Sequence, residues 1–414
     1  MAQHVVDLLE PDQGPRHPAI LSYGFRPMFF LAACQAALAV PVFVVLWLGF
    51  DIAAISIAPI SWHAHEMFYG FAAAVVAGFL MTAVPNWTGA TPVRGRRLLA
   101  LALLWLAGRL AFWSSGVLPA ALVAAVDLAF LPALALAVGP AIVAARNRRN
   151  YMFFALLALL VAGNAAMHAG LLGLDGNFDF ARRGQFLALD IVVLMIAMIG
   201  GRIIPAFTGN FLRAAALRSG HTPPVLSARP LVDRAGIISL ALLALAGLVL
   251  GDRNVIVGAL SLLAAVANGA RLAGWRGWSV RGESILFVLH LGYCWLVLGL
   301  ALRGLDVLLE LFVGAAGLHA LTIGAIGTMT MAVMARAALG HTGRPMSAPP
   351  LLLAAFALVS LSALLRLAGA LPALADLFQM LLFAAAGAWS VAFALFAAIL
   401  LPIVFRPRVD GLPG

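Results

Sequence analysis

Several residue types that carry chemistry in other proteins are scarce or absent in this sequence. It has no lysine, so all 26 of its basic residues are arginine. Cysteine occurs twice, as Cys34 and Cys294, and each lies inside an apolar run. A disulfide framework is therefore excluded, and a thiolate metal site is not supported. The sequence has no nucleotide-binding glycine loop and no haem-attachment Cys-x-x-Cys-His, so any haem must be held without a covalent bond.

Charged residues are also few. They make up 10% of the sequence, hydrophobic residues make up 64%, and the mean hydropathy is +1.05. A soluble protein of this length could not bury so many apolar side chains. The apolar residues form runs of about 17 to 29 residues between short polar stretches, which is the pattern of transmembrane helices. The sequence therefore predicts an all-α integral membrane protein.

Twelve such runs are expected to span the membrane. They cover residues 28–50, 66–88, 97–113, 117–145, 151–173, 184–208, 230–250, 254–270, 283–302, 308–336, 349–370 and 373–404. We expect a single membrane domain over residues 28–404, with cytoplasmic tails over 1–27 and 405–414. The first tail is polar and has no apolar core, so it does not resemble a cleaved signal peptide and the first helix is expected to be retained.

The arginines are distributed unevenly among the loops. Alternate loops are rich in them: Arg94, Arg96 and Arg97; Arg146, Arg148 and Arg149; Arg213, Arg218 and Arg229; Arg271, Arg276 and Arg281; Arg336 and Arg344; Arg406 and Arg408. The positive-inside rule places these loops and both termini in the cytoplasm, in agreement with an even number of spans. Orientation in the lipid bilayer thus accounts for the net charge of +10, and we expect no nucleic acid as a partner.

A short motif recurs near the ends of three predicted spans. Spans two, six and ten end in Trp87-Thr88-Gly89, Phe207-Thr208-Gly209 and His341-Thr342-Gly343, at intervals of 120 and 134 residues. This spacing predicts three repeats of four helices. When the repeats are aligned on the Thr-Gly pair, His65 and His319 both fall 23 residues before the threonine. We therefore expect these histidines at similar depth, on different helices, in the outer half of the membrane.

Five histidines lie in or at the edge of predicted spans: His63, His65, His168, His290 and His319. An ionisable side chain inside a membrane is energetically unfavourable, so such residues usually have a function. Imidazole is the usual axial ligand of haem iron and a good copper ligand. A haem in a helix bundle takes its ligands from facing helices. We expect His65 and His319 to hold a haem and His63 and His168 to lie near them. His290 is expected to lie deeper, at a second centre or on the side where electrons enter.

The neighbouring histidines His63 and His65 allow two arrangements. On a regular helix, residues two apart point about 200° away from each other, so they could not share one metal. That arrangement applies if the helix begins at Ser61. If it begins at Glu66, both histidines lie in an extended segment and could bind copper together. Both arrangements are compatible with the sequence.

Acids and arginines near these histidines are further candidates. Glu66 and Asp190 are candidate proton donors, although Glu66 also suits the positive end of a helix dipole and a salt bridge would equally explain Asp190. Arg202 and Arg336 are candidates for binding haem propionates, because arginine pairs well with carboxylates. Alternatively, their charges extend to water at the inner interface.

Several motifs resemble those of the NnrS family of bacterial membrane proteins. The matching stretches are Gly24-Phe25-Arg26-Pro27, Trp62-His63-Ala64-His65-Glu66-Met67, Pro85-Asn86-Trp87-Thr88-Gly89, Gly201-Arg202-Ile203-Ile204-Pro205-Ala206-Phe207-Thr208, His290-Leu291-Gly292-Tyr293, His319-Ala320-Leu321-Thr322 and Gly340-His341-Thr342-Gly343-Arg344-Pro345. The resemblance implies a multi-pass protein of the bacterial inner membrane that contains haem and copper and is tied to nitric oxide and nitrosative stress. It includes His341, which its loop position otherwise predicts to be solvated.

The functional hypothesis that follows is a haem-b protein, with copper, that binds nitric oxide and can reduce it to nitrous oxide with electrons from membrane quinol. A metal held by His63 or His65, with Glu66 close by, would provide the nitric oxide site. One alternative is a non-catalytic haem or copper sensor or metal-handling protein, which would bind these cofactors without turnover. Another is a transporter, because twelve spans and an internal repeat also suit that class.

Overall fold

The structure is a computed structural model, and it describes residues 17–52, 54–146, 150–174, 176, 178–222, 226, 229–312 and 315–411. All regular elements in these residues are helices, and no strand occurs among them. This confirms the all-α membrane fold expected from the sequence. Most of the predicted N-terminal tail, the loop residues Arg148 and Arg149, and the last three residues lie outside the described residues.

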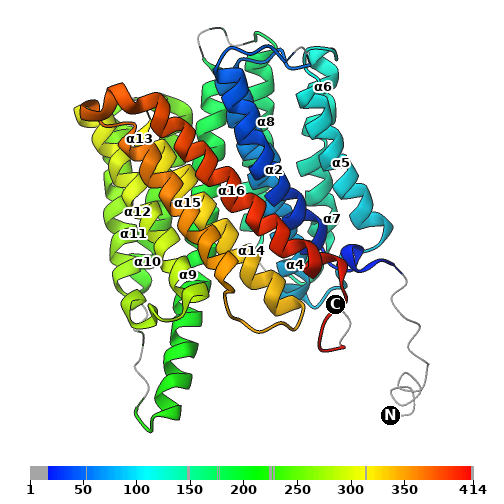
Figure 1. The fold of residues 1–414 in the computed structure, drawn as a ribbon, viewed down its shortest axis with the longest axis vertical. Coiled ribbons are helices and arrows are strands. Elements are labelled where there is room, and N and C mark those ends of the chain that lie inside the picture. The colour runs from blue at the N-terminus through cyan, green and yellow to red at the C-terminus, as the bar shows by residue number, and fades with distance from the viewer. Residues whose placement is uncertain are drawn as a thin grey trace.

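The helices follow one another with short connections. In chain order they are η1 (Ala19–Leu21), α2 (Phe25–Trp47), α3 (Pro59–His65), η2 (Glu66–Ala72), α4 (Ala73–Thr88), α5 (Arg96–Trp113), α6 (Ala120–Leu128), α7 (Phe130–Ala144), α8 (Met152–Leu171), α9 (Phe180–Arg218), α10 (Pro230–Leu250), α11 (Val255–Ala273), η4 (Gly277–Val280), α12 (Ser284–Leu309), α13 (Ala316–His319), η5 (Ala320–Gly327), α14 (Thr328–His341), α15 (Pro350–Ala368), η6 (Pro372–Leu377) and α16 (Phe378–Phe405). Figure 1 shows these helices packed as one bundle.

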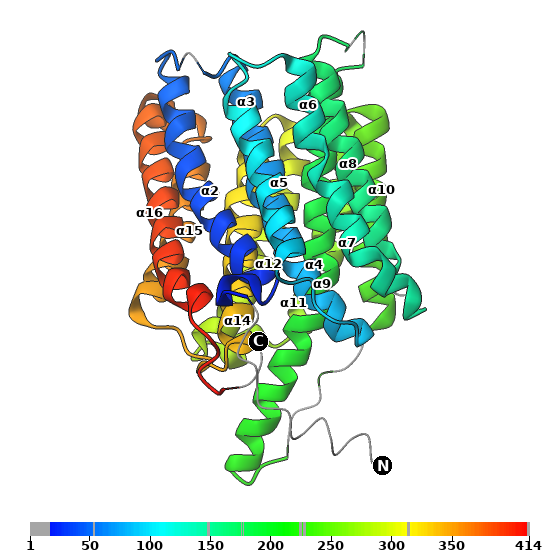
Figure 2. The same ribbon diagram turned by 90° about the vertical axis from the view of Figure 1, so that its right-hand side faces the viewer.

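Eleven helical segments of the described chain are long and apolar enough to cross a membrane. The remaining predicted span is α5, an 18-residue helix that contains Arg96, Arg97 and Arg109 and is therefore less apolar than the others. It nevertheless packs against α6 and α7 and runs beside them in the bundle (Figure 2). Each of the twelve predicted spans thus has a helical counterpart within the described residues.

Several of the predicted span boundaries are wrong, including the start of span two, which lies at Pro59 rather than at residue 66. Helix α9 continues to Arg218, well beyond the predicted end at residue 208, and its last turns project from the bundle (Figure 1). Helix α12 continues to Leu309, and the next span begins only at Ala316 rather than at residue 308. Near the end of α12, Asp306 Oδ2 lies 3.0 Å from Arg253 Nη1, so this acid is paired.

The first and last spans lie side by side, and the start of α2 meets the end of α16 (Figure 1). In the first turn of α2, Arg26 Nη1 donates hydrogen bonds to the carbonyl oxygens of Ile403 and Val404, at 3.2 and 3.0 Å. Further along, Trp389 Nε1 donates to the carbonyl oxygen of Ala36 at 2.9 Å. The start of α2 and the end of α16 therefore lie at the same end of the bundle, as an even number of membrane crossings requires.

Spans two and ten share an irregularity that the other spans lack within the described residues. Each contains a π-helical segment, η2 in span two and η5 in span ten. Each π segment begins directly after a histidine, His65 or His319. A π-helical turn holds an extra residue and is frequent at functional sites. The two histidines that the repeat places at equivalent positions therefore also have equivalent local structure.

The ends of these two spans are equivalent as well. Gly89 and Gly343 follow the last turns with positive φ angles of 71° and 70°, a left-handed conformation that closes a helix and that glycine adopts without strain. In span six, α9 instead continues through Gly209. The predicted repeat is thus evident between spans two and ten, whereas span six departs from it.

Candidate functional site

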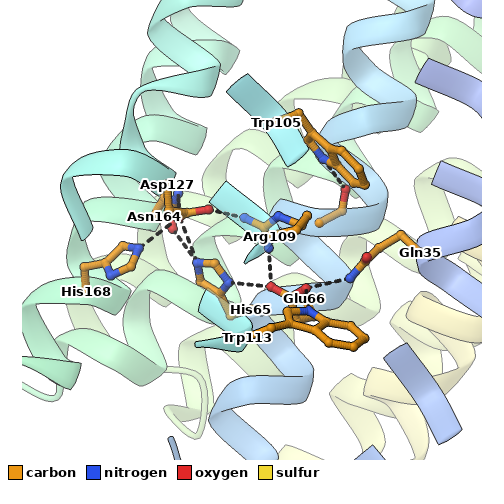
Figure 3. A network of polar contacts seen from close by, with 10 residues as sticks. Gln35, His65, Glu66, Trp105, Arg109, Trp113, Asp127, Asn164 and His168 are labelled. Carbon is orange, nitrogen blue, oxygen red and sulfur yellow. Dashed lines mark hydrogen bonds and ion pairs between the residues drawn. The ribbon is translucent and has the colours of Figure 1, made fainter. Parts of the chain in front are cut away.

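A network of polar side chains is buried where α3, α5, α6 and α8 meet (Figure 3). His65, the last residue of α3, is fully buried within it. Its Nδ1 lies 3.3 Å from Glu66 Oε1, and its Nε2 lies 3.0 Å from both Asp127 Oδ2 and Asn164 Oδ1. Both ring nitrogens of His65 therefore face oxygen atoms.

Asp127 on α6 collects bonds from three other helices. Its Oδ2 accepts from Asn164 Nδ2 at 2.8 Å and lies 2.9 Å from His168 Nε2, while its Oδ1 accepts from Arg109. Asn164 and His168 are four residues apart on α8, so they project from the same face of that helix. The carboxylate of Asp127 is consequently the point at which these side chains converge.

Glu66, like Asp127, accepts several hydrogen bonds. Its Oε2 accepts from Gln35 Nε2 and from Trp113 Nε1, both at 2.6 Å, and its Oε1 accepts from Arg109. The guanidinium of Arg109 therefore bridges Glu66 and Asp127 (Figure 3). Because an unpaired buried carboxylate is strongly unfavourable, these bonds explain how two acids are accommodated inside the bundle.

His65, Asp127 and His168 form a group that could hold a metal ion. One potential ligand atom from each residue lies within 4.8 Å of the others, and all three residues are buried. Imidazole and carboxylate donors together are a common ligand set for first-row transition metals.

A second feature is a cavity of about 330 Å³ beside α3 and α13, which lies within the size range of small-molecule sites. Its wall is mostly apolar and includes the aromatic rings of Phe43, Phe68, Phe71 and Trp389. The polar residues that line it are Gln185, Thr322, Ser362, Arg366, His63 and His319. An apolar cavity with a few polar groups is typical of a cofactor or ligand site.

The two histidines of this cavity have unused ring nitrogens. His319 Nδ1 lies 2.8 Å from the carbonyl oxygen of Ala315, which can only accept a hydrogen bond, so Nδ1 carries the proton and the Nε2 lone pair of the neutral ring is available. His63 stacks on Phe43 with ring centroids 4.3 Å apart, and its buried Nδ1 has no hydrogen-bond partner in the described chain. This donor set fits a haem, whose axial ligands are commonly imidazoles.

Of the two arrangements that the sequence allows for His63 and His65, the structure has the helical one. Helix α3 begins at Pro59, so the two rings diverge, with His63 lining the cavity and His65 in the network around Asp127. The alternative in which both histidines lie in an extended segment and bind one copper ion together is therefore wrong. The cavity also brings His319 together with His63, rather than with His65 as the repeat suggested.

Asp190 lies in a different ion pair. It is on α9, and its carboxylate bonds to the guanidinium of Arg303 on α12, with Arg303 Nη2 3.4 Å from Asp190 Oδ2. Both side chains are buried. Of the two roles open to Asp190 from the sequence, the structure places it in a salt bridge.

The remaining predicted site residues lie apart from both features. His290 Nε2 lies 2.9 Å from Thr208 Oγ1. The guanidinium of Arg336 lies over the ring of Phe207, 3.8 Å from its centroid. Arg202, on α9, is partly buried and has an interaction partner. None of these residues lines the described cavity or takes part in the contacts that make up the network of Figure 3.

The expectation that His341 is solvated is wrong. Helix α14 extends as far as His341, and the start of the first span packs there, with ring centroids 5.4 Å from Tyr23 and 5.8 Å from Phe25. His341 and Phe25 both belong to the motif stretches quoted above. Two of those stretches, far apart in the sequence, therefore meet in the structure.

Sequence reasoning does not single out Arg109, Asn164, Arg366 or Asp127 as site residues. The sequence does contain a signal for two of them, Arg109 and Asn164. Arg109 stands alone in an apolar stretch, which is unfavourable without a buried partner. Asn164 and His168 have the spacing that places two side chains on one helix face.

The fold and these two features together define a multi-pass helical membrane protein with a buried histidine–carboxylate network and an internal ligand cavity. A family model described as NnrS protein matches residues 19–408, nearly the whole chain. The chain therefore belongs to the NnrS family, which is linked to the response to nitric oxide and associated with haem and copper. A comparison with curated proteins gives no match.

Proposed function

We propose that this protein is a haem-b protein of the bacterial inner membrane that binds nitric oxide at a haem held in the cavity beside α3 and α13. The observation that carries the proposal is the state of His319. Its Nδ1–H is held by the carbonyl of Ala315, which leaves Nε2 free as a ligand. Histidines that bind metals usually donate their other N–H to such an acceptor, which fixes both the tautomer and the ring orientation.

The rest of the cavity has the chemistry that a haem requires. His63 also lines this cavity and offers a second imidazole, and the aromatic residues of the wall would exclude water from a bound haem. Arg366 places a positive charge at the cavity, suited to a propionate carboxylate. A haem bound there would supply an iron able to coordinate nitric oxide. The role of the chain is to hold that haem and to keep its surroundings apolar.

Reduction of nitric oxide is the stronger form of this proposal. Two nitric oxide molecules give one nitrous oxide and one water with two electrons, for which membrane quinol is the proposed donor, and two protons. The predicted proton donors are both engaged: Glu66 accepts three hydrogen bonds from Gln35, Trp113 and Arg109, and Asp190 is paired with Arg303. Proton delivery from either would require an ion pair to open, so the geometry supports binding more directly than turnover.

The test is a spectrum of the protein purified in detergent. We expect a b-type Soret band that shifts when nitric oxide is added, and we expect His319→Ala to lose this band. The matched control is His221→Ala, which removes an exposed histidine. A folded wild-type protein without haem, or an unchanged band in His319→Ala, contradicts the proposal. Nitrous oxide formation from quinol, measured on the same sample, distinguishes a reductase from a binding protein.

A further inference from the structure

We infer that His65, Asp127 and His168 bind a first-row transition-metal ion, with Asn164 as the fourth donor, at a centre separate from the haem cavity. This inference adds a second centre to the proposed function and does not depend on haem binding. It is carried by the geometry and charge of the network in Figure 3.

The donor atoms are already close to the positions that a metal would require. Asp127 Oδ2 lies 3.0 Å from His65 Nε2 and 2.9 Å from His168 Nε2, and Asn164 Oδ1 lies 3.0 Å from His65 Nε2. In a tetrahedral site with metal–ligand bonds of about 2.1 Å, ligand atoms stand about 3.4 Å apart. These three distances are each within about 0.5 Å of that tetrahedral separation.

Three helices fix these donors. His65 ends α3, Asp127 is on α6, and Asn164 and His168 occupy one face of α8. Donors on packed helices keep their positions more accurately than donors on loops. The π-helical segment that begins at Glu66 follows directly after His65, as expected where the backbone is adjusted to aim a functional side chain.

Glu66 holds the principal histidine ligand. Its carboxylate lies 3.3 Å from His65 Nδ1, so it can accept a hydrogen bond from a protonated Nδ1, and the lone pair of Nε2 is then available to bind the metal. A carboxylate that orients a metal-binding histidine and raises its basicity is a recurrent arrangement. Glu66 is itself fixed by Gln35, Trp113 and Arg109. The orientation of His65 is therefore determined by bonds that do not involve the metal.

The charge of the network favours a cation. Glu66 and Asp127 contribute two negative charges and Arg109 one positive charge, while neutral imidazoles contribute none. One negative charge is thus uncompensated among side chains that are almost wholly buried. A bound metal ion compensates it. A proton could compensate this charge instead. It would make His65 a cation that donates hydrogen bonds to both Glu66 and Asp127, so metal binding has to be distinguished from protonation of His65.

The donor set also indicates which metal ion should bind most tightly. It consists of two imidazoles, a carboxylate and an amide oxygen, without sulfur. Sites of nitrogen and oxygen donors bind copper(II) more tightly than the other divalent first-row ions. We therefore expect copper(II) to be retained in preference to zinc.

The test uses the full-length protein, purified in detergent, treated with EDTA, loaded with copper sulfate or zinc sulfate and desalted. We expect one copper per chain by elemental analysis and an electron paramagnetic resonance spectrum with coupling to two imidazole nitrogens. His168→Ala should lose both, and His221→Ala, which removes an exposed histidine, should retain both. Asp127→Asn should lose copper too, although it also disturbs Arg109.

Thermal unfolding distinguishes loss of metal from loss of fold. A ligand that binds only the folded state raises its melting temperature, so copper should raise that of the wild type and of His221→Ala but not that of His168→Ala. Zinc with the same dependence on His168 supports the site and overturns the preference for copper. A folded wild type that retains neither metal, with no rise in melting temperature, overturns the inference in favour of a protonated His65. Haem content, measured on the same samples, reports separately on the cavity.

Discussion

His65 and His319 occupy the same place in two distant spans, each as the last residue before a π-helical segment. The two rings nevertheless lie in different surroundings, because His65 contacts Asp127 whereas His319 lines the cavity. The backbone irregularity is therefore common to both spans, and the neighbouring helices decide what each histidine contacts. Each of the two inferred centres contains one of these equivalent histidines.

The first prediction concerns the bond between Glu66 and His65. Glu66→Gln keeps the size of the side chain and all inferred metal ligands but removes the negative charge that orients His65. We expect copper affinity to fall by about 10- to 100-fold, the usual effect of removing a carboxylate that holds a ligand histidine. Competition titration with a chelator of known affinity measures this. Affinity equal to the wild type would show that Glu66 does not orient His65.

The second prediction concerns Arg109, which bridges two carboxylates. Arg109→Met leaves Glu66 and Asp127 buried without their counter-charge, and breaking a buried ion pair from one side costs about 3–5 kcal/mol. The same change at Arg182, whose exposed side chain lies 2.7 Å from Asp252, should cost about 1 kcal/mol or less. Unfolding in mixed detergent micelles measures both. Equal losses would contradict a structural role for Arg109.

The sequence predicts the helices of this fold well, because a span of apolar residues is a local property of the chain. It also identifies His63, His65, His168 and His319, because an imidazole in such a run stands out. It does not predict that His65 and Asp127 meet, since lateral packing of α3 against α6 has no periodic signal.

The π-helical segments are a further reason for the difference. Each π turn accommodates an extra residue and so rotates the following helix by about 100° relative to a regular one. Span two contains one such segment between His65 and Thr88, and span ten contains one between His319 and Thr342. Counting back 23 residues from the threonines finds equivalent positions, but it cannot give the direction in which each ring points.

The third prediction separates structure from catalysis at Asp190. Asp190→Asn leaves Arg303 buried without its counter-charge, so we expect a loss of about 3–5 kcal/mol in stability. The Soret band and its shift with nitric oxide should be unchanged per mole of folded protein, because Asp190 does not line the cavity. Melting curves and spectra of the same sample measure both effects. If instead stability is retained and nitrous oxide formation is lost, Asp190 is a proton donor.

The fourth prediction concerns a substitution that partly fills the cavity. Ala386 on α16 lines the cavity of about 330 Å³, so Ala386→Phe places a ring at its wall and reduces the space left for a haem. We expect haem to be lost while the fold and the copper content remain, because the inferred metal ligands lie outside this cavity. Val391→Phe on the same helix is the matched control, since Val391 is 50% exposed and points away from the packed interior. The absorbance ratio of the Soret band to the protein band measures the effect. Equal haem content in both variants would place the haem elsewhere in the bundle.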